Sequence, residues 1–152
     1  MDSTAMYEYI LSRIQEDLLP YGYKRSGKGG LFYRYSCEGK VGCAIEMQKS
    51  MFNSPGVYSF TFNLGCVALY ELNGYDKDKL SLQPLRLATR SYQSGGMRIG
   101  HLCRGRDYWW EITDGILKMF TLEKYYELFV QKDIQKAAEY LDEMAIKKEN
   151  VY

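Results

Sequence analysis

The polar residues that could do chemistry gather in one stretch, Ile45 to Cys66, which reads IEMQKSMFNSPGVYSFTFNLGC. Glu46, Gln48, Thr61 and Asn63 alternate there with apolar residues. This alternation predicts two strands joined by a Pro-Gly turn, with one face buried and the other polar. A carboxylate beside amides and a hydroxyl suits acid–base chemistry or ligand recognition, so we expect any site to lie on this face.

Metal-dependent hydrolysis would need clustered carboxylates, often with a lysine two residues from one of them. Glu38-Gly39-Lys40 has this spacing but falls in a predicted turn. The lysine after Glu46 is Lys49, three residues on, which is the wrong spacing for one face of a strand. We therefore predict no metal site.

Nucleophilic catalysis has as little support in the sequence as metal-dependent hydrolysis. The single histidine, His101, lies two residues from Cys103, and in the strand that we expect there both would share a face. Such a pair is more often structural, and no Gly-x-Ser-x-Gly motif occurs. The glycine-rich stretch 26–30 lacks the phosphate-loop pattern. We expect no catalytic residue and no cofactor; an enzyme built on Cys103 and His101, or on Glu46, is kept as the last alternative.

The composition restricts the class of protein. A chain of 152 residues predicts one domain, residues 1–152, with a hydrophobic core large enough to be stable without disulfides or a structural metal. Lys and Arg number 20 against 19 Asp and Glu, so the net charge of +1 argues against nucleic acid and against an anionic membrane. The sequence has four cysteines, no Cys-x-x-Cys pair, no signal peptide and no long apolar run. We expect a cytoplasmic protein with free thiols.

The elements that must position the polar residues can be read from the periodicity. Residues 4–19 predict an amphipathic helix, capped by Ser3 or Thr4 and ended by Pro20 with Gly22. Residues 68–96 form a long polar excursion that could hold a short helix. Strands are expected at 23–25, 31–37, 43–49, 58–66, 97–102 and 108–113. One or two helices are expected after Thr121. Asp133 can cap the second helix, or the two can be continuous or kinked near Lys132. The predicted fold class is α+β, an antiparallel sheet of five or six strands flanked by an N-terminal helix and one or two C-terminal helices.

Aromatic residues are unusually common, with 15 Tyr, 6 Phe and 2 Trp. Trp109 and Trp110 would lie on opposite faces of a strand, so one can pack in the core while helices or a partner cover the other. Arginines 98, 104 and 106 lie close to this pair in sequence, and arginines with aromatic rings can stack single-stranded bases. Nucleic-acid binding therefore stays an alternative, although the near-neutral charge argues against it.

Three segments together resemble a bacterial family, domain of unknown function 4304. They are LLPYGYKRSGKGGLFYR (18–34), MQKSMFNSPGVYSFTFNLGC (47–66) and RIGHLCRGRDYWWEI (98–112); Tyr23 stands where the family more often has phenylalanine. The resemblance implies no established reaction. Its members are similar in size and setting to small bacterial immunity and accessory proteins. The positions that it marks are Gln48, Lys49, Ser50, Asn63, Arg98, Trp109 and Trp110.

The leading hypothesis from the sequence is a non-catalytic protein that binds another protein, as an immunity or antitoxin-like inhibitor does. The candidate binding residues are Gln48, Lys49, Ser50, Asn63, Arg98 and Trp109. The alternative is a domain that binds a small ligand or nucleic acid through the face of Gln48, Asn63 and Arg98. A purely structural role for Gln48 and Asn63, in which the buried amides hydrogen-bond a neighbouring loop or an aromatic hydroxyl, is also open.

Overall fold

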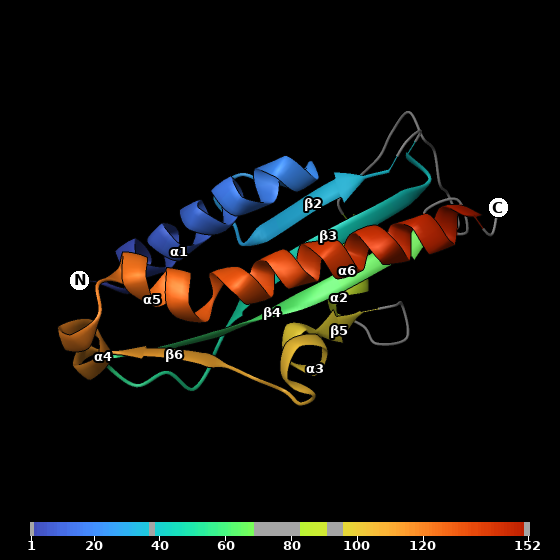
Figure 1. The fold of residues 1–152 in the computed structure, drawn as a ribbon. Coiled ribbons are helices and arrows are strands. Elements are labelled where there is room, and N and C mark those ends of the chain that lie inside the picture. The colour runs from blue at the N-terminus through green and yellow to red at the C-terminus, as the bar shows by residue number, and fades with distance from the viewer. Residues whose placement is uncertain (1, 37–38, 69–82, 91–95, 151–152) are drawn as a thin grey trace.

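The computed structural model describes residues 2–36, 39–68, 83–90 and 96–150. It has the predicted α+β architecture, in which a six-stranded antiparallel sheet packs with an N-terminal helix and C-terminal helices (Figure 1). In chain order the elements are α1 (Ser3–Leu18), the 3-10 turn η1 (Leu19–Tyr21), β1 (Lys24–Arg25), β2 (Leu31–Tyr35), β3 (Val41–Lys49), β4 (Val57–Ala68), α2 (Gln83–Arg90), β5 (Met97–Arg98), α3 (Ile99–Arg104), β6 (Trp110–Thr113), α4 (Asp114–Met119), α5 (Leu122–Phe129) and α6 (Gln131–Asn150).

The two long strands β3 and β4 form the centre of the sheet. The strand order is β1-β2-β3-β4-β5, and β6 also pairs with β4. The register of β3 and β4 runs from Val41 opposite Ala68 to Lys49 opposite Phe60. On its other edge β4 pairs first with β6 and then with β5. The predicted hairpin is therefore confirmed, and it is longer than the alternation alone indicated.

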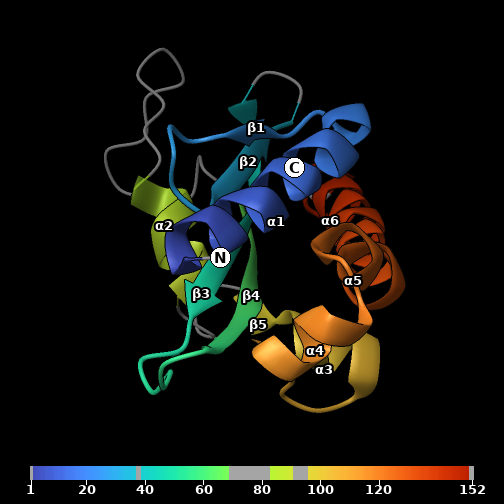
Figure 2. The same cartoon turned by 90° about the vertical axis from the view of Figure 1, so that its left-hand side faces the viewer.

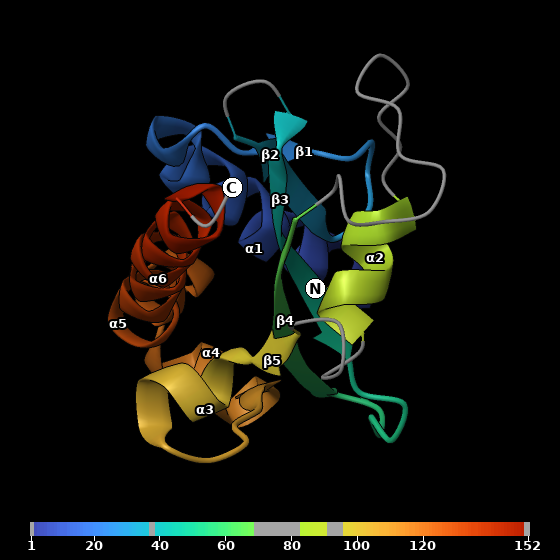
Figure 3. The same cartoon turned by 90° about the vertical axis from the view of Figure 1, so that its right-hand side faces the viewer.

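Helices cover the two faces of the sheet unequally. In Figures 2 and 3, α1, α5 and α6 lie on one side of β3 and β4, and α2 is the helix of the described residues that lies on the other. The main core forms between the three helices and the alternate residues of the hairpin that face them, including Ile45, Phe60 and Phe62. A small second cluster, centred on Leu31, Ala44 and Leu85, packs under α2. The polar residues of the hairpin share the α2 face.

Helix α1 follows its prediction with one correction at the start. Its buried stripe recurs at helical spacing, and the chain leaves it through η1 and Gly22, whose φ of 85° is left-handed. The cap is neither Ser3 nor Thr4. The side chain of Asp2 accepts the N–H of Ala5 instead, because a carboxylate is the stronger acceptor at the positive end of a helix.

The strand predicted at 97–102 is wrong beyond its first two residues. After Met97 and Arg98 the chain turns into α3, which ends at Gly105 with a φ of 71°. Residues two apart on a helix point in different directions, so His101 and Cys103 do not face each other. His101 is exposed, while the Cys103 Sγ lies 3.9 Å from the carbonyl oxygen of Asp133. The Cys–His pair that a strand would have allowed is not formed.

The C-terminal third is helical, as predicted. Thr121 caps α5 by accepting the N–H of Lys124, and the chain breaks at Val130 before α6 begins. Asp133 therefore lies in the first turn of α6 and is not its cap. The short helix α4, capped by Thr113, has no counterpart in the prediction. Within the excursion at 68–96 the structure describes α2; residues 69–82 and 91–95 of that prediction lie outside the described residues.

Among the helices of the described residues, none combines the length and apolar character needed to cross a membrane.

Candidate binding site on the central hairpin

The cleft of the molecule that contains predicted site residues lies at the end of β3, beside the turn that leads into β2. Its volume is about 480 Å³, within the range of small-ligand sites. The described residues that line it are Gly30, Glu46, Met47, Gln48, Lys49 and Asn63. Three of the six predicted binding residues therefore meet in one cleft.

Gln48 and Asn63 form the polar centre of this cleft. The register places Glu46 opposite Asn63 and Gln48 opposite Thr61, so Gln48 and Asn63 are diagonal neighbours on one face. The Nδ2 of Asn63 donates to the Oε1 of Gln48 over 2.9 Å. This bond uses the acceptor of Gln48 and one donor of Asn63. The Gln48 amide N–H groups and the Asn63 carbonyl oxygen keep hydrogen-bonding capacity for a ligand.

Helix α2 limits the cleft on the side of Glu46. The hydroxyl of Thr89 donates to the Glu46 Oε1 over 3.2 Å. The helix comes this close because residue 65 is glycine: a Cβ there would lie 2.9 Å from the backbone carbon of Ala88 and the backbone nitrogen of Thr89. Glu46 is therefore engaged by the helix that covers the sheet, which favours a framework role for its carboxylate.

Gly30 shapes the opposite wall. Its carbonyl oxygen accepts the N–H of Met47 over 2.9 Å, so the turn before β2 is bonded to β3. A Cβ at position 30 would lie 3.1 Å from the Cβ of Met47, tighter than ordinary contact. A larger residue at position 30 would crowd the strand at the place where the cleft is lined.

The loop beyond the cleft carries two exposed apolar side chains. Met51 and Phe52 are 87% and 89% exposed, the highest values among the large apolar residues described as exposed. Figures 2 and 3 show this loop, between β3 and β4, extending away from the helices. We call Met51 and Phe52 the hairpin tip. Apolar side chains of this size in full contact with water mark a surface that a partner can cover.

Side-chain hydrogen bonds hold the loop that carries the hairpin tip. The Oγ of Ser50 accepts the N–H of Phe52. The Oδ1 of Asn53 accepts the N–H of Ser59, and its Nδ2 donates to the hydroxyl of Tyr7 over 2.9 Å. That contact ties the loop to α1, and burial raises the pKa of Tyr7, so its hydroxyl stays protonated. The tip is thus presented by an ordered loop.

The other three predicted residues do not line the cleft. The Oγ of Ser50 accepts the N–H of Phe52 within the loop, as described above. Arg98 pairs with Asn63 in the backbone register, but its guanidinium lies 3.2 Å from the Asp107 carboxylate and 4.9 Å from the centre of the Trp109 ring. The indole N–H of Trp109 donates to the same carboxylate. Arg98 and Trp109 therefore belong to a separate cluster around Asp107.

Lys49 differs from its neighbours in the cleft because it sits on the other face of β3. Its Nζ lies 4.4 Å above the centre of the Tyr7 ring, in a cation–π contact. Lys49 is exposed, so its charge stays close to the hairpin tip without entering the amide pair. It links the cleft to the loop that carries Met51 and Phe52.

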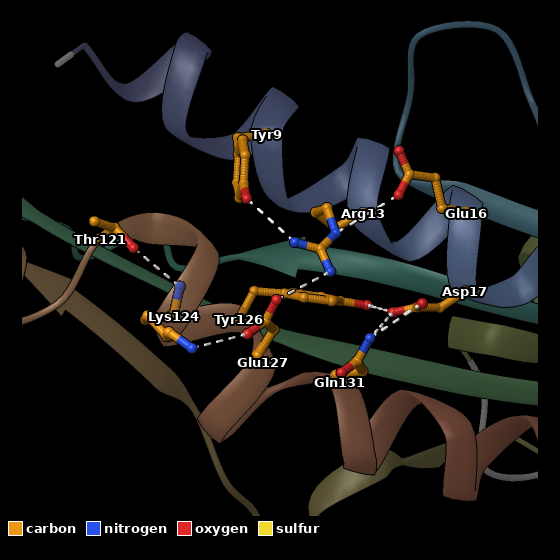
Figure 4. Close-up of polar contacts among 9 residues, drawn as sticks. All are labelled: Tyr9, Arg13, Glu16, Asp17, Thr121, Lys124, Tyr126, Glu127 and Gln131. Carbon is orange, nitrogen blue, oxygen red and sulfur yellow. Dashed lines mark hydrogen bonds and ion pairs between the residues drawn. The ribbon is translucent and has the colours of Figure 1, made fainter.

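A second polar cluster joins α1 to α5 and α6 (Figure 4). The Asp17 carboxylate accepts the Tyr126 hydroxyl over 2.6 Å and the Gln131 amide over 3.0 Å. The guanidinium of Arg13 lies 5.0 Å from the Tyr126 ring and 3.8 Å from the Glu127 carboxylate. These groups point at one another between the helices, so the cluster is better suited to hold the helices together than to bind a ligand.

The sequence left part of the site unrecognised. Thr89 and α2 lie in a region without clear periodicity, and Gly30 belongs to a glycine-rich turn whose sequence does not indicate that it lines a cleft. The hairpin tip did carry a signal: Met51 and Phe52 are adjacent apolar residues in a loop that also contains Asn, Ser, Pro and Gly. Across the described residues, no three His, Cys, Asp or Glu side chains gather as metal ligands would.

Comparison with known families gives one match. A family model described as Domain of unknown function (DUF4304) matches residues 14–139, which is well over half of the chain. This confirms the resemblance seen in the three sequence segments. The matched region includes the whole hairpin, the cleft and the tip. No curated protein and no solved structure matches the chain.

Proposed function

The chain belongs to the DUF4304 family, and from the geometry of its central hairpin we propose that it is a non-catalytic protein that binds another protein. The observation that carries the proposal is the hairpin tip, two adjacent apolar side chains that are 87% and 89% exposed on an ordered loop. A protein partner fits because large apolar and aromatic side chains are the usual anchors of protein interfaces.

The cleft supplies the second part of the binding surface. Gln48 and Asn63 keep hydrogen-bonding capacity there, and the tip begins three residues after Gln48. An apolar anchor next to amide groups matches the common interface pattern of a dry centre with polar surroundings. We propose that a partner side chain or loop enters the cleft while the tip inserts into the partner.

An inhibitor of the bacterial immunity or antitoxin-like kind would suit this surface. Such a protein needs complementarity and a preorganised surface, because rigid loops lose less entropy on binding. The hydrogen bonds of Ser50 and Asn53 supply that rigidity. In the cleft, Glu46 is engaged by Thr89 and Lys49 lies over Tyr7, which favours recognition over catalysis. The unlinked thiols of Cys43 and Cys66 suit the reducing cytoplasm, where we place the protein.

Affinity capture from the native host tests the proposal. The wild-type protein, a tip variant (Met51→Ser with Phe52→Ser) and a matched control (Met119→Ser with Leu128→Ser) are compared by quantitative mass spectrometry. The control changes two other exposed apolar residues, which are 76% and 59% exposed, so it loses a similar apolar surface elsewhere. We expect one stoichiometric protein with the wild type and the control, and its loss with the tip variant. Equal recovery by all three, or no stoichiometric protein, would count against the proposal.

A small ligand in the cleft is the second candidate, favoured by the volume of about 480 Å³ and the free capacity of the amides. A thermal-shift screen of small polar metabolites tests it, with Gln48→Leu as the variant that should abolish any shift. Nucleic acid has less support, because Arg98 and Arg104 do not line the cleft and are paired with Asp107 and Asp133. Binding of single-stranded oligonucleotides that is lost with Arg98→Ala would favour nucleic acid over both other candidates.

A further inference from the structure

Two cysteines face each other across the central strands, on the face away from the cleft. Cys43 of β3 is directly opposite Cys66 of β4, and their Sγ atoms are 3.6 Å apart. Cα atoms of directly opposed residues in an antiparallel pair lie about 4.5–5.5 Å apart, within the range that disulfides span. Formation of a bond of about 2.05 Å needs only side-chain rotation and a small shift of the strands.

We propose that Cys43 and Cys66 are an oxidation site, at which hydrogen peroxide converts the two thiols into a disulfide that joins β3 to β4. The register brings the pair together, because the two residues are 23 positions apart in sequence. The third cysteine that the structure describes, Cys103, lies on α3 against the carbonyl oxygen of Asp133 and has no part in this pair.

The surroundings of the pair distinguish its two thiols. The pKa of Cys66 is lowered, first because Cys43 donates a hydrogen bond to it, and further by the nearby charges of Lys148 and Arg34. The pKa of Cys43 is raised, because its proton is held in that hydrogen bond and because it is buried. Of the two, Cys66 is therefore the thiol that more readily forms a thiolate, so in the proposed reaction it attacks and Cys43 resolves the intermediate.

The reaction balances with one peroxide molecule. The Cys66 thiolate attacks one peroxide oxygen, the O–O bond breaks, and hydroxide leaves, which gives a sulfenic acid at Cys66. The Cys43 sulfur then attacks the Cys66 sulfur and displaces the hydroxyl, which leaves as water with the proton of Cys43. Two thiols are oxidised, one peroxide is reduced to two waters, and the protein loses two hydrogen atoms.

Access to the pair is through the end of α6. Cys43 and Cys66 are only 1% and 3% exposed, and Cys43 lies against the carbonyl oxygen of Leu141. Lys148 and Glu149, whose charges act on Cys66, belong to the last turn of that helix and are partly exposed. Helix ends open more readily than helix centres, and peroxide is little larger than water, so opening of this turn is the route by which we expect peroxide to reach Cys66.

Peroxide treatment of the folded and the unfolded protein tests the site. The protein carries Cys37→Ser and Cys103→Ser, so that the pair contains its only thiols. We expect the folded protein to lose both thiols and two hydrogen masses and to give a linked peptide, with at least about tenfold less oxygen gain than the same protein in urea, because the fold holds the second sulfur at high effective concentration for the resolving step. Thiols that stay reduced in the folded protein while they react in urea, or oxygen gain without a linked peptide, would overturn the proposal.

The order of attack is tested with two near-isosteric variants in the same background. With Cys43→Ser, we expect dimedone to trap a sulfenic acid at Cys66. With Cys66→Ser, we expect Cys43 to be trapped at least about tenfold more slowly, because it lacks the partner that favours a thiolate. Equal trapping of the two variants would contradict the assigned roles. Circular dichroism checks that both variants are folded.

Discussion

At the scale of single residues, Asp17 does most to connect the helices. Its carboxylate extends from α1 and accepts hydrogen bonds from Tyr126 of α5 and Gln131 of α6 (Figure 4). A bond to a charged acceptor contributes more than one between neutral groups, and a buried carboxylate that loses a donor keeps its desolvation cost. These contacts make the packing of three helices depend on one side chain.

Tyr126→Phe removes the hydroxyl that lies 2.6 Å from Asp17 and leaves the ring in place. We expect the free energy of unfolding to fall by about 1.5–3 kcal/mol, measured by urea denaturation. Tyr125→Phe is the matched control, since its hydroxyl donates to a neutral backbone oxygen, that of Glu111, over 3.2 Å. The control should lose only about 1 kcal/mol. An equal or smaller loss in Tyr126→Phe would show that Asp17 gains little from this bond.

The same tyrosine gives the fold a sensitivity to alkaline pH. Burial and the Asp17 carboxylate raise the pKa of Tyr126. Above the ordinary tyrosine value of about 10, the unfolded chain loses this proton while the folded chain keeps it, so stability that is complete below pH 10 is lost as the pH rises further. Urea midpoints from about pH 8 to about pH 11 should fall for the wild type and fall less steeply for Tyr126→Phe. Parallel slopes would contradict this account.

At the scale of elements, α2 depends on the absence of a side chain at position 65. A Cβ there would lie 2.9 Å from backbone atoms of Ala88 and Thr89. We expect Gly65→Ala to cost about 1–3 kcal/mol and to increase amide exchange in residues 83–90, because α2 must move away from β4. Gly29→Ala is the control, since its Cβ would meet only an oxygen at 3.6 Å. Unchanged exchange in α2 would mean that the helix adapts without cost.

Periodicity predicted the elements whose two faces differ strongly. The hairpin of β3 and β4 alternates for many residues, and α1 has an apolar stripe over four turns, so both were recognised close to their true bounds. The stretch that begins at Met97 was misread because it is short. Its apolar residues suit both alternation and a helical turn, and the helical turn ends at Gly105, whose backbone is left-handed.

The site was predictable only where it lies on regular strands. Gln48 and Asn63 could be placed on one face because alternation fixes the face of every residue in a strand. The sequence gives no register between distant elements, so it could not separate Arg98 and Trp109, which turn to Asp107, from the cleft. The exposure of the hairpin tip likewise depends on where the loop projects.

At the scale of the whole molecule, the two faces of the sheet have different roles. The face under α1, α5 and α6 is closed by the main core. Of the helices in the described residues, α2 is the one on the other face; it packs on β3 and β4 beside the end of the hairpin, where the cleft and the exposed tip lie. The larger core thus lies on one side of the sheet, and recognition, in our proposal, takes place on the other.

The near-neutral charge of the molecule makes a prediction about binding. With a net charge of +1, no global field steers a charged partner, and the proposed contacts are apolar and amide groups. The affinity for the captured protein should change less than about tenfold between low and high salt, measured by titration calorimetry, whereas binding to nucleic acid would fall steeply. A steep loss with salt would favour a charged interface over the hairpin tip.

The dissociation constant of the captured partner for three forms of the protein tests the central claim most directly. The forms are the wild type, the tip variant (Met51→Ser with Phe52→Ser) and the control (Met119→Ser with Leu128→Ser), all checked for equal stability. We predict that the tip variant binds at least about 100-fold more weakly, because two buried anchors each contribute about 2 kcal/mol or more, and that the control binds like the wild type. Equal affinity of the tip variant and the control would contradict the claim that the hairpin is the binding surface.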